Sequence, residues 1–211
     1  MSIDRMRHWD AVYQAKPPTG VSWYQPHLQQ SLSLIQSSPL GKDARVIDVG
    51  GGASTLIDDL LDAGFRQPAV LDVSRQALER AKARLGARAD AVAWIEGDVT
   101  DVSLPAQAYD VWHDRAVFHF LVTEEDRAAY VAQMRRALRP DGQAVIAAFS
   151  PNAPPTCSGL TVIRYSPERL SAELGGGFTL LESRIEAHQT PFGTTQEFIY
   201  CRFALDRAGS A

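Results

Sequence analysis

A run of three glycines behind a carboxylate, "DVGGG" at residues 48–52, is the feature that most constrains how this chain folds. The apolar run "ARVIDVG" that leads into it is typical of a short buried strand. The segment "STLIDDLLDAG" that follows has apolar residues at helical spacing. Glycine permits a tight turn and the close approach of a ligand, and the next helix offers free N–H groups. The unit therefore predicts a strand, a ligand-binding loop and a helix, with a glycine-rich turn that binds nothing as the alternative.

The chain continues to alternate between strands and helices. Helices are predicted at 75–86 and 123–140, with Ser74 and Thr123 as their N-caps. Such alternation indicates a parallel sheet that is covered on both faces. The segment 140–142, "PDG", predicts a turn before the fifth strand. Four strands are predicted beyond the first, at 68–74, 91–99, 108–114 and 143–149.

The end of the chain follows a different pattern. "SPERLSAELGG" predicts a short helix with Ser166 as its N-cap. Strand-like runs at 178–190 and 195–205 are joined by a short turn, and they must be antiparallel because a parallel pair needs a long crossover. The predicted fold class is α/β, a doubly wound sheet of five parallel strands plus a C-terminal antiparallel hairpin. Residues 1–40 are predicted to form an N-terminal helical or lid segment of a single domain over 1–211.

Composition limits the classes of partner. Hydrophobic residues make up 45% of the chain and charged residues 22%, which is typical of a globular protein. The net charge of −4 provides no basic field for nucleic acid. No apolar run approaches the ~18 residues of a membrane helix, and "MSIDRMRHWD" has no apolar core of a secretory signal. Cys157 and Cys201 form no disulfide framework or zinc spacing. We expect a cytoplasmic protein without metal, nucleic-acid or membrane partners, and the oligomeric state stays open.

Two further carboxylates follow predicted strands. Asp72 ends the second strand, where a carboxylate can accept both hydroxyls of a ribose. Asp98 follows the third strand and can accept the exocyclic amine of an adenine. Either residue alone could be a helix cap or a solvated charge. Together with Asp48 they place three acids at the carboxyl ends of three successive strands, which indicates a ligand that contains a nucleoside.

In these motifs the chain resembles the class I S-adenosylmethionine (SAM)-dependent methyltransferases, which have a Rossmann-like fold. The glycine loop matches the first motif of that family, with Ser54 where a third glycine is common. Asp72 matches the ribose-binding acid, and Asp98 with Val99 matches the adenine-binding pair. "LRPDG" and the final hairpin match as well, so that the resemblance covers roughly residues 40–205. It implies an enzyme of class EC 2.1.1.- that uses SAM and releases S-adenosylhomocysteine (SAH).

Two segments outside the strand–helix pattern are candidates for covering the site. The aromatic pair in "GVSWYQPH" either packs as a hydrophobic staple or acts as a lid that offers a cation–π face to the sulfonium of SAM. The Pro-rich connection that carries Cys157 and Arg164 is a candidate substrate lid. The resemblance and the lid hypothesis together predict these cofactor contacts: Trp23, Tyr24, Asp48, Gly50, Gly51, Gly52, Ser54, Asp72, Val73, Asp98, Val99 and Asp114.

The segment "WHDRAVFHFL" carries the catalytic candidates. Methyl transfer needs a nucleophile held in line, and a base where that nucleophile is protonated. Asp114 lies where the resembled family lines the methyl-transfer pocket, and Arg115 lies at the same strand end. His119 is either a base or a packed aromatic, and His113 is interpreted as a core or edge histidine. The catalytic candidates are therefore Asp114, Arg115 and His119.

The methyl acceptor stays open at this stage. A small nucleophile such as a thiol or sulfide suits an aromatic pocket under a lid, and it is our first interpretation. The alternative is a lysine on a protein, because "HWDAVYQ", "DRA" and "PFGTTQEFIY" loosely resemble the small protein-lysine methyltransferases. A non-catalytic SAM-binding module is a third class.

Overall fold

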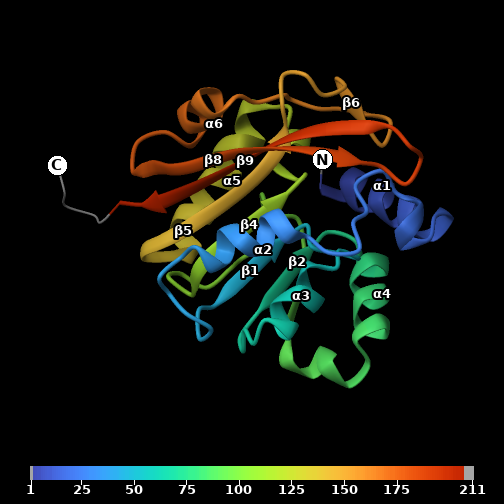
Figure 1. The fold of residues 1–211 in the computed structure, drawn as a ribbon, viewed down its shortest axis with the longest axis horizontal. Coiled ribbons are helices and arrows are strands. Elements are labelled where there is room, and N and C mark those ends of the chain that lie inside the picture. The colour runs from blue at the N-terminus through green and yellow to red at the C-terminus, as the bar shows by residue number, and fades with distance from the viewer. Residues whose placement is uncertain (1, 207–211) are drawn as a thin grey trace.

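A seven-stranded sheet forms the centre of the part that the computed structural model describes, residues 2–206 (Figure 1). Its strands are β1 (Val46–Val49), β2 (Ala69–Asp72), β3 (Ala93–Glu96), β4 (Tyr109–Arg115), β5 (Leu138–Phe149), β8 (Phe178–Gln189) and β9 (Thr195–Leu205). The strand order is β3-β2-β1-β4-β5-β9-β8. The first five pair in parallel, and β9 is antiparallel to both β5 and β8. The predicted fold class is confirmed.

The helices lie where the sequence pattern predicts them. The hydroxyls of Ser74, Thr123 and Ser166 each accept a hydrogen bond from a backbone N–H in the first turn of the helix that follows, which confirms all three N-caps. The helical elements are α1 (Ser2–Ala15), η1 (Pro18–Gly20), α2 (Gln29–Gln36), α3 (Leu56–Asp62), α4 (Arg75–Leu85), η2 (Gly86–Ala91), η3 (Phe118–Phe120), α5 (Glu124–Ala137) and α6 (Pro167–Leu174).

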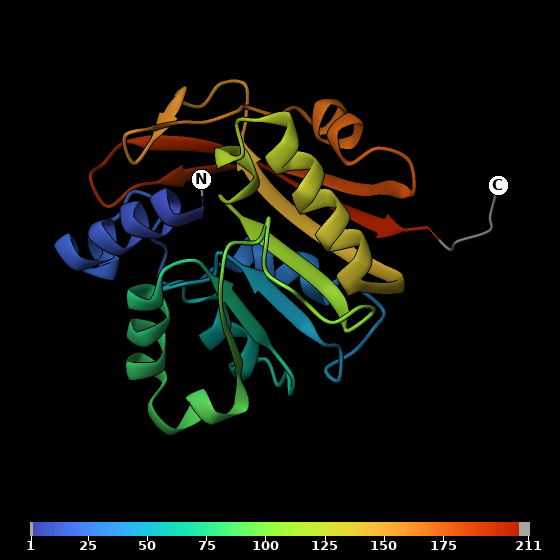
Figure 2. The same ribbon diagram turned by 180° about the vertical axis from the view of Figure 1, so that it is seen from behind.

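Side chains on neighbouring strand positions belong to two separate cores. Ile47, Trp112 and Ile146 pack with residues of α5 and α6 on one face of the sheet. Val46 and Val111, each one position earlier in its strand, pack with α2 and α3 on the other face. Figure 1 shows α2 and α3 in front of the sheet. Figure 2, the view from behind, shows α5 across the opposite face. Because strand side chains alternate between faces, each apolar strand fills both cores.

The junction of α5 and β5 differs from the prediction. The helix was expected to extend to residue 140 and to be followed by a turn, yet it ends at Ala137 and β5 begins at Leu138. Leu138 pairs with Tyr109, and the register then shifts before the pairing resumes at Gln143. Asp141 has φ of 64° in this irregular stretch. Proline biases the residue before it toward extended backbone, so that the chain leaves the helix earlier than the apolar pattern indicates.

The ends of two strands and one connection also depart from the sequence pattern. Strands β2 and β3 are shorter than the predicted ranges 68–74 and 91–99. The Pro-rich connection after β5 contains a small hairpin that was not predicted, formed by β6 (Thr156–Cys157) and β7 (Leu160–Thr161). Its two turn residues, Ser158 and Gly159, have φ of 50° and 77°, the positive values that a tight two-residue hairpin requires.

Candidate active site

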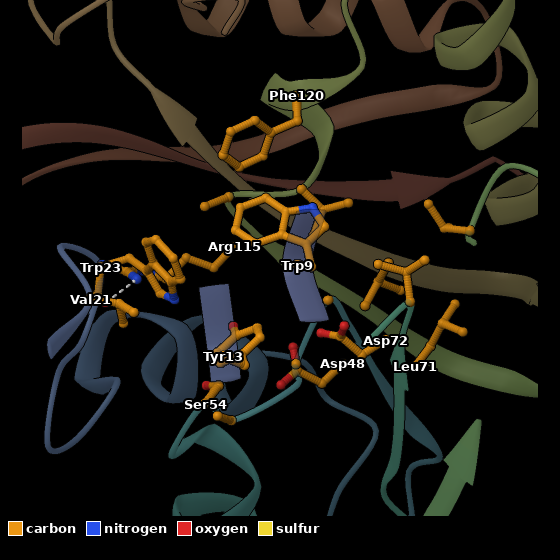
Figure 3. Close-up of a pocket in the computed structure, with 18 of the residues that line it drawn as sticks. Trp9, Tyr13, Val21, Trp23, Asp48, Ser54, Leu71, Asp72, Arg115 and Phe120 are labelled. Atoms are coloured by element: carbon orange, nitrogen blue, oxygen red, sulfur yellow. Dashed lines mark hydrogen bonds between the residues drawn. The ribbon is translucent and has the colours of Figure 1, made fainter. Parts of the chain in front are cut away.

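A pocket lies at the carboxyl ends of β1, β2 and β4, the edge at which an open parallel sheet binds its ligands (Figure 3). The glycine loop and the acids behind β2 and β3 form one end, which we call the nucleoside end. Helix α1, the segment 18–28, the turn after β4 and the β6–β7 hairpin enclose the other end, which we call the acceptor end. Of the predicted cofactor contacts, these line the pocket: Trp23, Tyr24, Asp48, Gly50, Gly51, Ser54, Asp72, Val73, Asp98 and Val99.

The glycine loop is packed more tightly against the protein itself than the sequence suggests. Gly50 has φ of 68°, and a Cβ there would overlap the side chain of Val117. A Cβ on Gly51 would overlap the carboxylate of Asp48 in the same way. Gly52, which does not line the pocket, gives room to the carboxylate of Asp72. The glycines therefore let the loop lie against these three side chains, and this packing holds its backbone at the pocket wall.

Asp48 is held by a pair of buried polar contacts. Its Oδ1 lies 2.7 Å from Nδ1 of His113, and Nε2 of the same imidazole lies 2.9 Å from the hydroxyl of Ser31. His113 is opposite Asp48 in the β1–β4 pairing and also lines the pocket. The other carboxylate oxygen, Oδ2, is buried and has no hydrogen-bond partner among the described residues. A buried acceptor of this kind at a pocket wall fits the ammonium group of an amino-acid ligand.

Asp72 has an unusual carboxyl group. Its Oδ1 accepts a hydrogen bond of 2.7 Å from the backbone N–H of Ser74. Burial raises the pKa of Asp72 to about 7, and the charges of Asp48 and Asp10 add to the rise. Among residues 2–206 no cationic side chain forms an ion pair with this carboxylate, and a ligand that donates hydroxyl hydrogens to it would stabilise the ionised form.

Asp98 has a partner that the sequence pattern did not reveal. It accepts a hydrogen bond of 3.0 Å from Nη1 of Arg5, and the same guanidinium also pairs with Asp126 of α5. Burial opposes the charge on Asp98, but hydrogen bonds from Thr100 and the positive charge of Arg5 outweigh it, so that the pKa of Asp98 is lowered. Helix α1 is thus tied to the nucleoside end by an ion pair.

Aromatic rings form much of the acceptor end. The ring of Trp9 meets the ring of Phe120 edge-on, with centroids 5.1 Å apart, and that of Trp23 at 5.7 Å. Tyr13 lies beside Trp23 in the same group, and Figure 3 shows Tyr13 on the side of Ser54 and Asp48, with the rings of Trp9, Trp23 and Phe120 across the pocket from them. Trp9, Tyr13 and Phe120 were not predicted as site residues. Only the aromatic composition of "HWDAVYQ" hinted at the first two.

Arg115 is the one catalytic candidate that lines the pocket. Its Nε donates to the hydroxyl of Tyr200 at 2.8 Å, and its Nη1 donates to the backbone carbonyl of Trp23 at 2.9 Å. Ser22 and Gln25 are held nearby, since their carbonyl oxygens accept from the imidazole of His188 and the hydroxyl of Thr55. The segment around Trp23 is therefore held at three carbonyls, two by side chains of the sheet and one by the N-cap residue of α3.

The structure places Asp114 outside the pocket, contrary to the expectation for this residue. Its carboxylate accepts from the backbone N–H groups of Val117 and Phe118 at 2.9 and 3.0 Å and from the hydroxyl of Tyr130 at 2.7 Å. Burial raises its pKa to about 6. Asp114 thus caps the turn after β4, where Ala116 takes φ of 72°, and its side chain faces the α5 core.

His119 also lies outside the pocket lining, with its side chain completely buried. Its Nδ1 accepts from the backbone N–H of Phe149 at 3.2 Å, and its ring lies against the rings of Phe120 and Phe149. Burial lowers its pKa to about 3, and the charge of Arg115 adds to the effect. The turn at Ala116 directs the chain so that His119 packs as a core aromatic, the alternative that the sequence left open.

No group of three His, Cys, Asp or Glu side chains within residues 2–206 could hold a metal ion. No helix in the same range is long and apolar enough to cross a membrane.

Comparisons with known proteins agree with this geometry. Residues 46–142 match the family model described as a methyltransferase domain. The eEF1A lysine and N-terminal methyltransferase of Mus musculus is 24% identical over 136 residues, which is 64% of this chain and 19% of the relative. The chain thus spans about a fifth of that relative's length. EEF1A lysine methyltransferase 2 of Homo sapiens is 24% identical over 197 residues, 86% of this chain and 77% of the relative.

Solved structures show the same fold. One, described as conversion of a disulfide bond into a thioacetal group during echinomycin biosynthesis, has a TM-score of 0.77 at 20% identity and covers 97% of this chain and 94% of its own. The N-methyltransferase NodS of Bradyrhizobium japonicum, solved with SAH, has a TM-score of 0.66 at 22% identity and covers 84% of each chain. The family match over residues 46–142, the fold and the site together support a class I SAM-dependent methyltransferase. Relatives within this class differ in the acceptor that they methylate.

The residues of the site fit SAM as its cofactor. The orphaned oxygen of Asp48 suits the ammonium of the amino-acid part, and the carboxylate of Asp72 suits two ribose hydroxyls. Asp98 has one oxygen with a single partner, so it can still accept from an adenine amine. The aromatic rings of Trp9 and Trp23 can face a sulfonium.

Proposed function

We propose that this chain transfers the methyl group of SAM to a small nucleophile whose attacking atom is sulfur, as a thiol or sulfide. The observation that carries the proposal is an acceptor end with largely apolar walls from which both candidate bases are excluded. Asp114 and His119 are sealed in the core. An acceptor that needs its proton removed would find neither of these groups within reach, whereas a thiol ionises with a pKa of ~8.5 and attacks as the thiolate.

The other titratable groups around the acceptor end support this conclusion. Burial raises the pKa of the Cys157 thiol to about 11 and also raises the pKa of Tyr13, so neither is an ionised base at neutral pH. Both ring nitrogens of His113 are already engaged, by Asp48 and Ser31. Catalysis in this site therefore depends on positioning and on the exclusion of water.

Each part of the chain has a role in that positioning. Asp72 binds the ribose, Asp98 and Val99 frame the adenine, and Asp48 with the glycine loop holds the amino-acid part. When bound, SAM supplies an activated methyl group on a sulfonium. Trp9 and Trp23 exclude water from this centre and hold the acceptor in line. We further propose that residues 1–211 act as one domain with residues 1–40 as its cover, and a cytoplasmic location stays a prediction.

A lysine side chain is the second candidate acceptor. The named activities of the two relatives favour it, and so do the aromatic rings, because such rings bind ammonium groups well. The charge of Arg115 argues against it. An ammonium at the acceptor end would lie near both this guanidinium and the sulfonium, and like charges in a partly buried pocket repel strongly.

The proposal is tested by a transfer assay with methyl-labelled SAM. The panel contains simple thiols, sulfide, small amines and lysate protein, and the Asp72→Ala variant is the control for cofactor-dependent transfer. We expect label in a methyl thioether product. Label confined to a protein band would instead support the lysine acceptor. Tight SAH binding with no transfer to any acceptor would support a non-catalytic SAM-binding module.

A further inference from the structure

One nitrogen of the Arg115 guanidinium has no use that the fold explains. The side chain is only 5% exposed, and Nε and Nη1 are satisfied by Tyr200 and Trp23. The third nitrogen, Nη2, is buried and has no hydrogen-bond partner among residues 2–206. A buried charged donor without an acceptor is costly, so proteins keep one mainly where a ligand completes it.

The nearest carboxylate does not fill this role. Oε2 of Glu186 lies 3.8 Å from Nη2, which is beyond hydrogen-bond distance. The two oxygens of Glu186 are engaged by other donors, the hydroxyl of Tyr200 at 2.9 Å and the amide of Gln25 at 3.1 Å. Glu186 therefore balances part of the charge of Arg115, but it leaves Nη2 of Arg115 without a hydrogen-bond acceptor.

The surroundings of Arg115 favour an anion. Its guanidinium lies 4.5 Å from the centre of the Phe198 ring, and it shares the acceptor end with Trp23 and Cys157. Burial lowers the pKa of both His119 and His188, and the positive charge of Arg115 lowers each further, so neither imidazole competes as a cation. The pocket's carboxylates, those of Asp48, Asp72 and Asp98, belong to the cofactor contacts. Within residues 2–206, Arg115 is thus the cation of the acceptor end, and its Nη2 is a donor without an acceptor.

We propose that Nη2 of Arg115 is a carboxylate-binding point at the acceptor end, so that the preferred methyl acceptor is a sulfur nucleophile that also carries a carboxylate. The inference rests on the proposed function for the identity of the attacking atom. A carboxylate is also present on the amino-acid part of the cofactor, and the same donor could bind that group. The site is the same in both cases, and the source of the carboxylate is an experimental outcome.

The first arm measures the affinity of SAH-loaded protein for a matched pair of thiols, mercaptoacetate and 2-mercaptoacetamide, by calorimetry. The two differ only in the carboxylate. We expect the acid to bind about 10- to 100-fold more tightly, the range for a charge-assisted hydrogen bond in a buried site. In Arg115→Gln the difference should fall to less than about threefold. Arg202→Gln is the matched control, because Arg202 of β9 carries a positive charge but does not line the pocket.

The second arm compares SAH with its decarboxylated analogue on wild-type and Arg115→Gln protein. If only the second arm shows a loss of affinity that depends on Arg115, Nη2 binds the carboxylate of the cofactor, and the inference about the acceptor is overturned. If only the first arm shows a preference for the carboxylate, Nη2 binds the acceptor, as we infer. If wild-type protein prefers the carboxylate in neither pair, or if the preference survives Arg115→Gln, the inference is wrong. The wild-type comparison holds even if the variant fails to fold. Equal methylation of both thiols overturns this inference alone, and methylation of neither contradicts only the proposed acceptor class.

Discussion

The two ends of the pocket are built in different ways. At the nucleoside end, the working groups follow directly on strand ends: Asp48 and the glycine loop on β1, Asp72 on β2 and Asp98 behind β3. At the acceptor end, the groups come from segments far apart in the chain. Trp9 of α1 meets Phe120 behind β4, and the carbonyl of Trp23 accepts from Arg115.

This difference separates the two tasks of the enzyme. The nucleoside end depends on the sheet, so it stays in place whenever the strands pair. The acceptor end depends on packing between α1, the segment 18–28 and the β6–β7 hairpin, so a change in the segment 18–28 or in the hairpin alters the acceptor pocket while the acids behind β1, β2 and β3 stay in place. Perturbing each end separately should therefore give two distinct sets of effects.

The largest effect is expected at the glycine loop. Gly50→Leu should abolish SAH binding, because a side chain there must overlap Val117 and because φ of 68° is strained for a non-glycine residue. Calorimetry with SAH measures the loss. Gly64→Ala is the control, since Gly64 has φ of 87° with no atom within 4 Å of a Cβ. It should cost about 1 kcal/mol of stability and leave SAH affinity unchanged. Normal SAH binding by Gly50→Leu would show that the loop does not approach the cofactor.

A smaller effect is expected for the ribose contact. Asp72→Ala should weaken SAH binding by about 10- to 100-fold, since a charge-assisted hydrogen bond contributes about 1.5–3 kcal/mol. Asp72→Asn should lose less, because the amide keeps one acceptor oxygen. Asp110→Ala is the control, because Asp110 lies at the end of β4 that is far from the pocket. Its carboxylate accepts from the backbone N–H of Arg45, and its removal should not change SAH affinity. Equal binding by wild type and Asp72→Ala would assign the acid to capping alone.

At the acceptor end, Trp23→Ala should reduce turnover by about tenfold while SAH affinity changes by less than about threefold, because the ring positions the acceptor and excludes water. Amide exchange in residues 21–25 should also slow when SAH is added, because the hydrogen bonds from Arg115 and His188 to this segment should open less often when the pocket is occupied. Turnover and hydrogen exchange are the two measurements. If exchange is unaffected by SAH and Trp23→Ala unfolds the protein, the tryptophan is core packing and the two ends are not separable.

The smallest effect is a pH dependence confined to the nucleoside end. Burial raises the pKa of Asp72 to about 7, so its carboxyl gains a proton as the pH falls below that value. SAH affinity should then decrease a few-fold between pH 7.5 and 5.5, because a protonated carboxyl accepts hydroxyl hydrogens poorly.

The same shift has the opposite effect on stability. Between pH ~4 and ~7 the folded state holds a proton on Asp72 that the unfolded state has lost, so this group reduces the stability of the ligand-free protein as the pH rises. Asp72→Asn should flatten both profiles. Calorimetry with SAH and thermal melts across this range test the prediction, and identical profiles for the two proteins would contradict it.

The sequence by itself determined the doubly wound sheet, its antiparallel hairpin, the helix caps and the nucleoside end. These features follow from local rules, because apolar periodicity, glycines and capping residues act within a few positions of one another. The places where local rules failed are also informative. Asp114 and Arg115 are neighbours in β4, so strand alternation directs Asp114 to the α5 core and Arg115 to the pocket, and the turn at Ala116 carries His119 into the core.

Only the tertiary structure decided the acceptor end and the partners of the acids at the nucleoside end. Arg5 pairs with Asp98 across 93 positions of sequence, and no periodicity or motif in α1 indicates that pairing. His113 looks like an ordinary strand histidine until the β1–β4 register places it against Asp48. Contacts of this kind arise when separate elements are packed together, and a linear pattern records which residues are apolar or charged but not which distant residue each one meets.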